Sequence, residues 1–554
     1  MITADLLITN AHIITVDNKN TRAGSVAIKE GIIERIWPQK QPPGGEVDYS
    51  KEPTVIDLKG STLIPGFIDT HNHLLMYSQF RKQANCSTPP NRTIQDLLDR
   101  ISDLAQETPD NEWVLGWGYD NTLLQEQRHP TRQELDAIVP DKPVFIRHTS
   151  VHFAVANSLA LKLAGIDETT PEPKGGFFGR DAAGNLDGVL HELPALKPVQ
   201  NVIPLPTEDE LASLIGEAAH DYLAQGITTS TDAGVGLDLG LTEFNAQLKA
   251  VKQGLNPIRM RFMVLHHLLN KDGYFKDYTA EQLDTYIQHE TNHKARLDSA
   301  KFFQDGSIQG LTGALRKPYY CEPELTGELL NDQQDFNRDV LALHNKGYRI
   351  ATHGNGDRAI GSIIEAYEHA INESPRHNHR HRIEHVQTAT MKDLDKIKEL
   401  DIAASFFINH IYYWGDRHKR LFLGPERAAK MNRLADALSK DILYTLHSDC
   451  PITPISPLFS IWAAVNRMTR EGDVLGEDQT VSVEEALRSM TIYGARLNFE
   501  DDVTGSIEIG KRADFAVLDA DPTRIDPGKI KDIQVETTIV GGEIVYNQKE
   551  RQLT

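Results

Sequence analysis

Short apolar, β-branched runs alternate with longer mixed segments through the middle of the chain. Most of the intervening segments are long enough to hold a helix. Eight apolar runs read as strands, at residues 66–73, 226–234, 260–267, 300–306, 348–354, 381–386, 402–407 and 442–449. Alternating β and α segments are typical of a parallel sheet. Eight such units predict an α/β fold with a closed (β/α)₈ barrel.

Both ends of the chain have a different pattern, of short strands joined by tight turns. Apolar runs occupy residues 5–37 near the start, and residues 513–522 and 535–547 near the end. In the last of these, Gly541 and Gly542 form a two-residue hairpin connection. We expect the two ends to build one β domain.

The gap between the first and second predicted barrel strands is too long for one helix. It contains a strand of its own at 143–149 and a glycine-rich stretch at 173–188. Loops longer than about 12–15 residues usually have a function. We therefore expect an insertion of about 76–205 that serves as a lid over the barrel mouth.

Composition narrows the class of protein. A length of 554 residues favours more than one domain, and 40% hydrophobic with 25% charged residues is ordinary for a globular protein. No apolar run is long enough to cross a bilayer, and the first residues lack signal-peptide features, so we expect a cytoplasmic protein without a membrane partner. A net charge of −21 disfavours nucleic acid, and three scattered cysteines disfavour a disulfide framework.

Candidate metal ligands stand at or near the ends of the predicted barrel strands. His71 and His73 share one face of the first strand, because side chains two apart in a strand point the same way. An isolated pair of this kind is more often a solvated turn. Four further polar residues occupy later strands or their ends: Lys301, His353, His385 and Asp449. A barrel brings these ends together, so the set predicts a divalent metal centre.

The ordered motifs PGFIDTHNH, GITTSTD, KFFQDGS, ATHGNGDRAI, RIEHVQ, HSDCP and KRADFAVLD resemble those of the amidohydrolase superfamily. The resemblance covers nearly the whole chain and is strongest to the branch that includes N-substituted formamide deformylase. It implies a distorted TIM (β/α)₈ barrel at 63–490, with a β-sandwich built from residues 1–62 and 491–554.

The resemblance also implies a ligand set. His71, His73 and Asp449 would hold one metal ion, His353 and His385 a second, and Lys301 would bridge them as an N-carboxylated lysine. Two zinc ions are expected, although Mn, Fe, Co or Ni suits the same ligands. If Lys301 stays unmodified, a single-metal site is the alternative, with Glu192 as the rival carboxylate.

Two positions depart from the usual pattern of these relatives. His447 stands where they commonly carry glycine, and Ser150 and Val151 stand where they usually carry Asp-Gly. The metal centre is expected despite both changes. Because of these two departures, we do not expect this chain to share the substrate specificity of those relatives.

The sequence indicates the substrate-contacting side chains less strongly than the candidate metal ligands. Each has a structural alternative, such as core packing for the aromatic residues and pairing with Asp357 for the arginine. The candidates are His152, Trp117, Tyr119, Arg358, Tyr412 and Trp414.

These features predict a hydrolase that cleaves a non-peptide C–N bond of a small molecule, an amide or an N-acyl or N-formyl amine. A metal-activated hydroxide would attack, with Asp449 as general base. The same centre also suits a lactone or other ester, a cyclic imide or a deaminase substrate. A non-catalytic, metal-binding regulatory barrel is the alternative of another class. The superfamily resemblance implies a homodimer or larger assembly.

Overall fold

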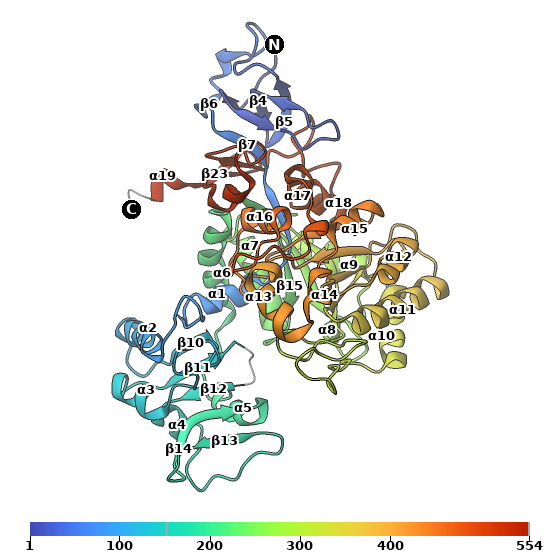
Figure 1. The fold of residues 1–554 in the computed structure, drawn as a ribbon. Coiled ribbons are helices and arrows are strands. Elements are labelled where there is room, and N and C mark those ends of the chain that lie inside the picture. Colours follow the sequence, from blue (N-terminus) through green and yellow to red (C-terminus); the bar gives the residue numbers. More distant parts are fainter. Residues whose placement is uncertain (150–152, 552–554) are drawn as a thin grey trace. The chain divides into compact units, whose positions relative to one another are not determined.

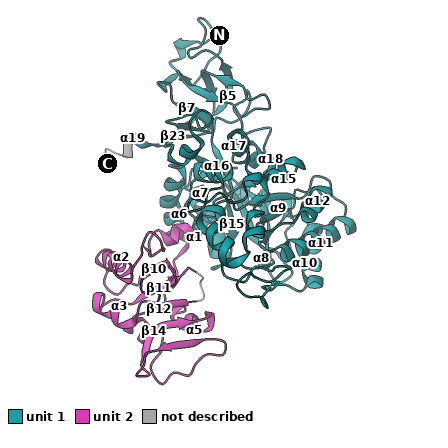
Figure 2. Ribbon diagram, viewed as in Figure 1, with its two compact units in different colours: residues 1–75, 212–554 teal, residues 76–211 magenta. Residues whose placement is uncertain are grey.

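The computed structural model describes residues 1–149 and 153–551 (Figure 1). Its contacts divide the chain into two compact units, which Figure 2 colours separately. Unit 1 contains Met1–Leu75 and Ala212–Thr554, and unit 2 contains Met76–Leu211. Each unit is described by itself.

The centre of unit 1 is an eight-stranded parallel sheet. The strands are β8 (Phe67–Asn72), β15 (Ile227–Val235), β16 (Arg259–Leu265), β17 (Ala295–Phe303), β18 (Ile350–Gly354), β19 (Arg382–His385), β20 (Ala403–Phe406) and β21 (Tyr444–Leu446). They follow one another in chain order from β8 to β21. The hydroxyls of Thr70 in β8 and Thr445 in β21 lie 2.8 Å apart, so the two edge strands meet and the barrel is nearly closed. All eight predicted strands are confirmed.

Strand β17 begins five residues before its predicted start. Its first half contains Arg296 and Asp298, which obscured the apolar pattern. The structure pairs Arg296 with Asp284 and Asp298 with Arg349, so each polar side chain has a partner of opposite charge. The backbone of this half pairs in parallel with β16.

Helices follow most of the barrel strands, as the alternating pattern predicts. Those between β15 and β20 are α7 (Leu241–Lys252), α8 (His266–Leu269), α9 (Ala280–Glu290), α10 (Gln333–Asn345), α11 (Asp357–Glu373) and α12 (Met391–Glu399). Thr279 and Thr390 begin α9 and α12 with reciprocal capping boxes. After β20 come α13 (His410–Arg417), α14 (Pro425–Ala429) and α15 (Leu434–Ser439), and after β21 come α16 (Pro457–Asn466), α17 (Val483–Ser489) and α18 (Ile492–Leu497).

Strands from both ends of the chain share one six-stranded sheet in unit 1. Its order is β24-β23-β22-β7-β2-β3, and the pairing of β22 (Phe515–Leu518) with β7 (Thr62–Pro65) joins the two ends. The remaining members are β2 (His12–Ile14), β3 (Arg22–Ala23), β23 (Val535–Val540) and β24 (Glu543–Asn547). The expected joining of the termini is confirmed.

A four-stranded sheet packs against this mixed sheet through a shared apolar core. Its order is β5-β4-β1-β6, with β1 (Leu6–Thr9), β4 (Ser25–Lys29), β5 (Ile32–Trp37) and β6 (Thr54–Asp57). Side chains from both sheets lie in one buried cluster, including Ile8, Ile28, Leu63, Phe515 and Ile539. The exact domain limits at residues 62 and 490 stay predictions.

Unit 2 has a sheet of its own, in the order β13-β14-β12-β11-β10-β9. The strands are β9 (Ala84–Asn85), β10 (Val114–Tyr119), β11 (Val144–His148), β12 (Phe153–Ala156), β13 (Phe177–Arg180) and β14 (Leu186–His191). The strand expected at 143–149 is therefore confirmed as β11. The helices of unit 2 are α1 (Leu74–Phe80, shared with the end of unit 1), α2 (Ile94–Glu107), α3 (Arg132–Ile138), α4 (Ser158–Leu163) and α5 (Leu193–Gln200). Its role as a lid stays a prediction.

Among the described residues, no helix combines the length and apolar character that a membrane span requires. The cytoplasmic location and the dimer stay predictions.

Candidate metal centre

The six predicted ligands all belong to unit 1, and five of them stand at or next to strand ends. His71 lies in β8 and His73 follows it; His353 lies in β18, His385 ends β19, and Asp449 follows β21. Lys301 lies two residues before the end of β17. In a parallel barrel these ends share one mouth, where active sites of this architecture are built.

Asp449 brings the first two histidines together. Its Oδ1 lies 3.3 Å from Nε2 of His71 and 3.2 Å from Nε2 of His73. Burial opposes ionisation of this carboxyl, but the contacts with both histidines hold the pKa of Asp449 well below its usual range. The group is therefore an ionised acceptor at neutral pH.

The other two histidines lie beside this group. The ring centroids of His385 and His71 are 4.8 Å apart, and those of His385 and His353 are 4.5 Å apart. Nε2 of His353 lies 3.0 Å from the carbonyl oxygen of Gly306, which can only accept, and 2.9 Å from Nδ2 of Asn355, which can only donate. Burial lowers the pKa of His353 to about 4, which leaves the neutral form that binds metals.

Two of the predicted ligands have left-handed backbone conformations. His385 has a φ of 73° and Asp449 a φ of 53°. Such angles are uncommon for residues other than glycine and cluster at functional sites. At His385 the turn breaks the strand's alternation, so its ring lies near His71 even though its neighbour Glu384 also contacts His71.

Lys301 is fully buried, and among the described residues its Nζ has no hydrogen-bond partner. Burial lowers the pKa of its amine to about 8, although the nearby carboxylates Glu384 and Asp449 oppose this shift. A buried amine without a partner is costly. Conversion to a carbamate would remove its positive charge and add two oxygen donors.

The donor set suits a divalent metal. One ligand atom each from His71, His385 and Asp449 lies within 4.8 Å of the others, and all three residues are buried. Nδ1 of His385 and Oδ1 of Asp449 have no hydrogen-bond partner in the described part of the chain. Imidazole and carboxylate are ligands that zinc and related ions prefer. The metal-binding role of the six residues stays a prediction that this geometry favours.

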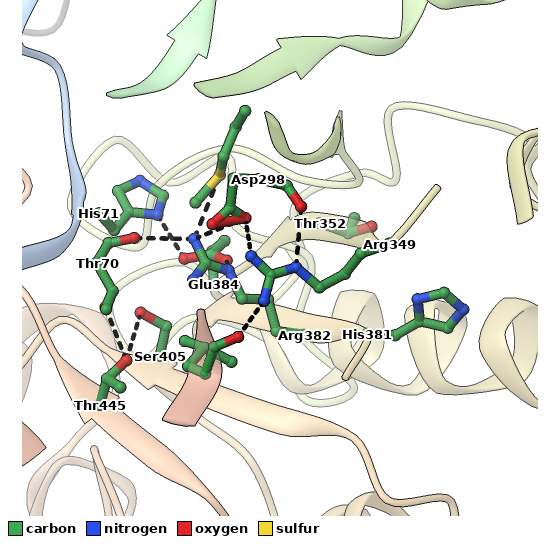
Figure 3. Close-up of polar contacts among 12 residues, drawn as sticks. Thr70, His71, Asp298, Arg349, Thr352, His381, Arg382, Glu384, Ser405 and Thr445 are labelled. Carbon is green, nitrogen blue, oxygen red and sulfur yellow. Dashed lines mark hydrogen bonds and ion pairs between the residues drawn. The ribbon is translucent and has the colours of Figure 1, made fainter. Parts of the chain in front are cut away.

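A buried ionic network beneath the histidines was missed by sequence reasoning. Glu384 accepts from Nδ1 of His71 at 2.5 Å and faces Nε of Arg382 at 2.5 Å (Figure 3). Burial opposes ionisation of Glu384, but Arg382, His71 and Lys301 together hold its pKa well below the usual range. The signal was present in RIEHV, because opposite charges two residues apart share one face of a strand predicted to be buried.

His447 also lies among the ligands. Its ring stacks on His71 at 4.6 Å and on Phe407 at 5.1 Å, and among the described residues neither of its nitrogens has a partner. Burial holds the pKa of His447 well below its usual value, so the ring is neutral. The position that departs from the usual pattern of relatives thus forms part of the site wall.

Two aspartates shape the loops around the ligands. Asp305 accepts backbone N–H groups from Ala314, Asn355 and Gly356, which fixes the turn after β17. Asp232 accepts from the backbone N–H of Leu75, two residues after His73.

The substrate-contact candidates of unit 1 fall into different surroundings. Trp414 lies against His410, with ring centroids 4.4 Å apart, and His410 contacts Phe407 beside His385. Tyr412 instead packs against Phe459 and Trp462 of α16. Arg358 donates to the carbonyl of Gly327. Of the three, only Trp414 is connected to the ligands through ring contacts.

The remaining candidates belong to unit 2. Trp117 stacks on Phe80 at 4.7 Å, and the hydroxyl of Tyr119 lies 2.8 Å from Nδ1 of His129. Glu192 precedes α5 with a φ of 67°, a strained conformation for this residue. His152 lies outside the described residues. The substrate roles of Trp117, Tyr119 and His152, and the ligand role of Glu192, stay predictions.

Comparisons with known proteins show the family of the chain. The profile of the amidohydrolase family matches residues 54–546. N-substituted formamide deformylase of Arthrobacter pascens is 31% identical over 551 residues, which cover 98% of this chain and 98% of that protein. Protein LONG AFTER FAR-RED 3 of Arabidopsis thaliana is 29% identical, covering 98% of this chain and 92% of that protein. The crystal structure of an uncharacterized metal-dependent hydrolase from Pyrococcus horikoshii OT3 is 25% identical, with a TM-score of 0.74 over 94% of this chain and 99% of that chain.

Proposed function

Because the chain belongs to the amidohydrolase family, we propose that its barrel mouth hydrolyses a non-peptide carbon–nitrogen bond of a small molecule. The family and the deformylase relative support a hydrolase of this class. The observation that carries the proposal is the convergence of buried ligand atoms from His71, His385 and Asp449. An amide or an N-acyl or N-formyl amine is the proposed substrate class.

Two groups of residues would each hold one divalent ion at this site. His71, His73 and Asp449 would hold one ion, and His353 and His385 a second, with Lys301 between them. When bound, such ions supply Lewis acidity toward a carbonyl and acidify water to a pKa near 7. Two zinc ions are proposed.

Asp449 is the proposed general base and then acid. Its carboxylate stays ionised at neutral pH, as its contacts with His71 and His73 require. It can therefore accept the proton that attacking water loses and deliver it to the leaving nitrogen. The amine product leaves as a neutral molecule.

Lys301 is the proposed bridging residue after reaction with CO₂. With a pKa of about 8, about a tenth of the amine is neutral at pH 7. The neutral amine forms a bond to the carbon of CO₂ and releases one proton, which gives a carbamate with two oxygen donors. The ionised Lys301 ammonium could not serve as a ligand.

Matched amides and esters test the proposal. The metal-loaded protein is given N-formyl and N-acetyl amines, and formate and acetate esters of the same alkyl groups, and released amine or acid is measured. We expect turnover of at least one amide series, lost after chelation and restored by metal. Turnover of esters, lactones or cyclic imides alone would contradict the proposed bond, and metal binding without hydrolysis of any probe would favour the regulatory barrel.

A further inference from the structure

Glu384 is a fully buried carboxylate that the proposed reaction does not use. One of its oxygens, Oε2, lies 2.5 Å from Nδ1 of His71. Because an ionised carboxylate can only accept, the proton of this contact belongs to Nδ1. Nε2, the nitrogen that this contact leaves for a metal ion, lies 3.3 Å from Oδ1 of Asp449.

Arg382 holds Glu384 and the strand of His71 at the same time. Its Nε faces Oε1 of Glu384 at 2.5 Å, and its Nη2 donates to the carbonyl of Thr70 at 2.8 Å (Figure 3). The guanidinium is fully buried, and its Nη2 also lies 3.9 Å from Asp298. Arg382 therefore sets the position of the residue before His71 and of the carboxylate that contacts its ring.

Three further contacts restrict His71. Its backbone N–H donates to Asp69 at 3.1 Å, and its ring is stacked on His447 and lies beside His385. These contacts limit the plane of the ring. A carboxylate faces each ring nitrogen, Glu384 at 2.5 Å from Nδ1 and Asp449 at 3.3 Å from Nε2, and the shorter contact assigns a proton to Nδ1.

A cation between His71, Glu384 and His447 is the competing arrangement, since their ligand atoms also lie within 4.8 Å of one another. The surroundings oppose it. Glu384 already faces the positive charge of Arg382, and its 2.5 Å contact with His71 leaves no room for an ion between them. Lys301 lies close enough to lower the pKa of Glu384 as well.

We propose that Glu384, anchored by Arg382, is a positioning residue that fixes the tautomer of His71 so that Nε2 is available to a metal ion. The inference rests on the proposed metal centre and adds a residue to it. Carboxylates that accept from a ligating histidine orient its ring and raise its basicity, and their loss typically weakens metal binding by about 10- to 100-fold.

Glu384→Gln tests the proposal sharply because glutamine has one oxygen where glutamate has two. If the amide oxygen of Gln faces Nδ1 of His71, its NH₂ group faces Nε of Arg382. Both of these groups are donors, so the contact with Arg382 is lost. If the oxygen faces Arg382, the NH₂ faces His71 and favours the tautomer with the proton on Nε2. Glu500→Gln is the matched control, because Glu500 is also buried and pairs with Arg261 and Arg512 away from the ligands.

The experiment measures Co²⁺ binding to the metal-free full-length protein by competition with a chelator, and the visible absorption of the bound Co²⁺. We expect binding to Glu384→Gln to be about 10- to 100-fold weaker than to wild type, with an altered spectrum. Glu500→Gln should keep wild-type affinity and spectrum. Equal affinity and spectrum in Glu384→Gln and wild type would overturn the proposal, whereas a wild-type protein that takes up no Co²⁺ would instead contradict the proposed function.

Two further variants complete the test. Glu384→Asp keeps the charge that Arg382 faces but shortens the side chain, so it should fold and also bind Co²⁺ more weakly than wild type. If both Glu384 variants fail to fold while Glu500→Gln folds, Glu384 acts on stability and the proposal is wrong. His447→Ala should leave the number of Co²⁺ ions per chain unchanged, and a loss of one ion would assign Glu384 to a cation site and overturn the positioning role.

Discussion

The two halves of the proposed ligand set are held by different kinds of contact. In the first half, His71 contacts an ionised carboxylate that an arginine anchors. In the second half, His353 contacts a neutral backbone carbonyl, and among the described residues Nδ1 of His385 has no hydrogen-bond partner. A histidine that donates to an ionised carboxylate is more basic than one that contacts a neutral carbonyl.

The difference indicates that the two halves are not equivalent. The half with His71, His73 and Asp449 contains a carboxylate ligand and the histidine supported by Glu384. We therefore expect the first divalent ion to bind there more tightly than the second ion binds at His353 and His385.

The largest effect is expected at Asp449, the residue that contacts both histidines of the first half. Asp449→Asn removes the proposed base, so the rate of hydrolysis should fall by roughly 10²- to 10⁴-fold. This fall is measured by steady-state kinetics with the amide that wild type hydrolyses fastest. Asp514→Asn, another buried carboxylate of unit 1, which pairs with Arg259, is the control and should keep most activity. A rate for Asp449→Asn close to that of the control would remove Asp449 from the chemistry.

Lys301, the proposed bridge between the halves, should make the stability of the metal-free protein depend on pH. Its pKa is about 8 in the folded chain and 10.5 in the absence of burial, so between these values the unfolded chain binds more protons. Stability should therefore rise with pH across this window, by up to about 3 kcal/mol.

The comparison is between wild type and Lys301→Met, in CO₂-free buffer after chelation, by urea unfolding from pH 7 to 10. The free energy of unfolding of wild type should rise relative to that of the variant. A constant difference between the two proteins would contradict the lowered pKa of the buried Lys301 amine.

The smallest effect is expected in the second half, which contains His353 and His385. Nδ2 of Asn355 donates to the carbonyl of Gly306 and lies 2.9 Å from Nε2 of His353, so Asn355→Ala removes one neutral contact of this ring and leaves the carbonyl in place. Metal affinity should fall only a few-fold, and by less than about 10-fold. A loss as large as that expected for Glu384→Gln would reverse the contrast between the halves.

Much of the barrel was predictable because buried parallel strands are continuous apolar runs. All eight strands were predicted in this way, and the six candidate ligands were proposed because polar residues at successive strand ends have few structural reasons to recur. The start of β17 was missed, since Arg296 and Asp298 depend on partners distant in sequence, Asp284 and Arg349.

The residues and turns that hold the candidate ligands in place were harder to predict. Glu384 is a single carboxylate inside a strand, and its role depends on a contact with His71, 313 residues away. The left-handed turn at His385 also has little signal in residue type, because only a few per cent of residues other than glycine adopt a positive φ. Trp414 and Tyr412 belong to one sequence motif, yet the helix directs them to different neighbours.

Metal content tests the central claim most directly. Wild type and Lys301→Ala are purified without added metal and analysed for bound elements per chain, with Lys511→Ala, another buried lysine of unit 1, as control. We predict close to two divalent ions in wild type and in the control, and one or fewer in Lys301→Ala. A single ion unchanged by the Lys301 substitution would contradict the bridged centre, and no ion in any of the proteins would contradict the metal site itself.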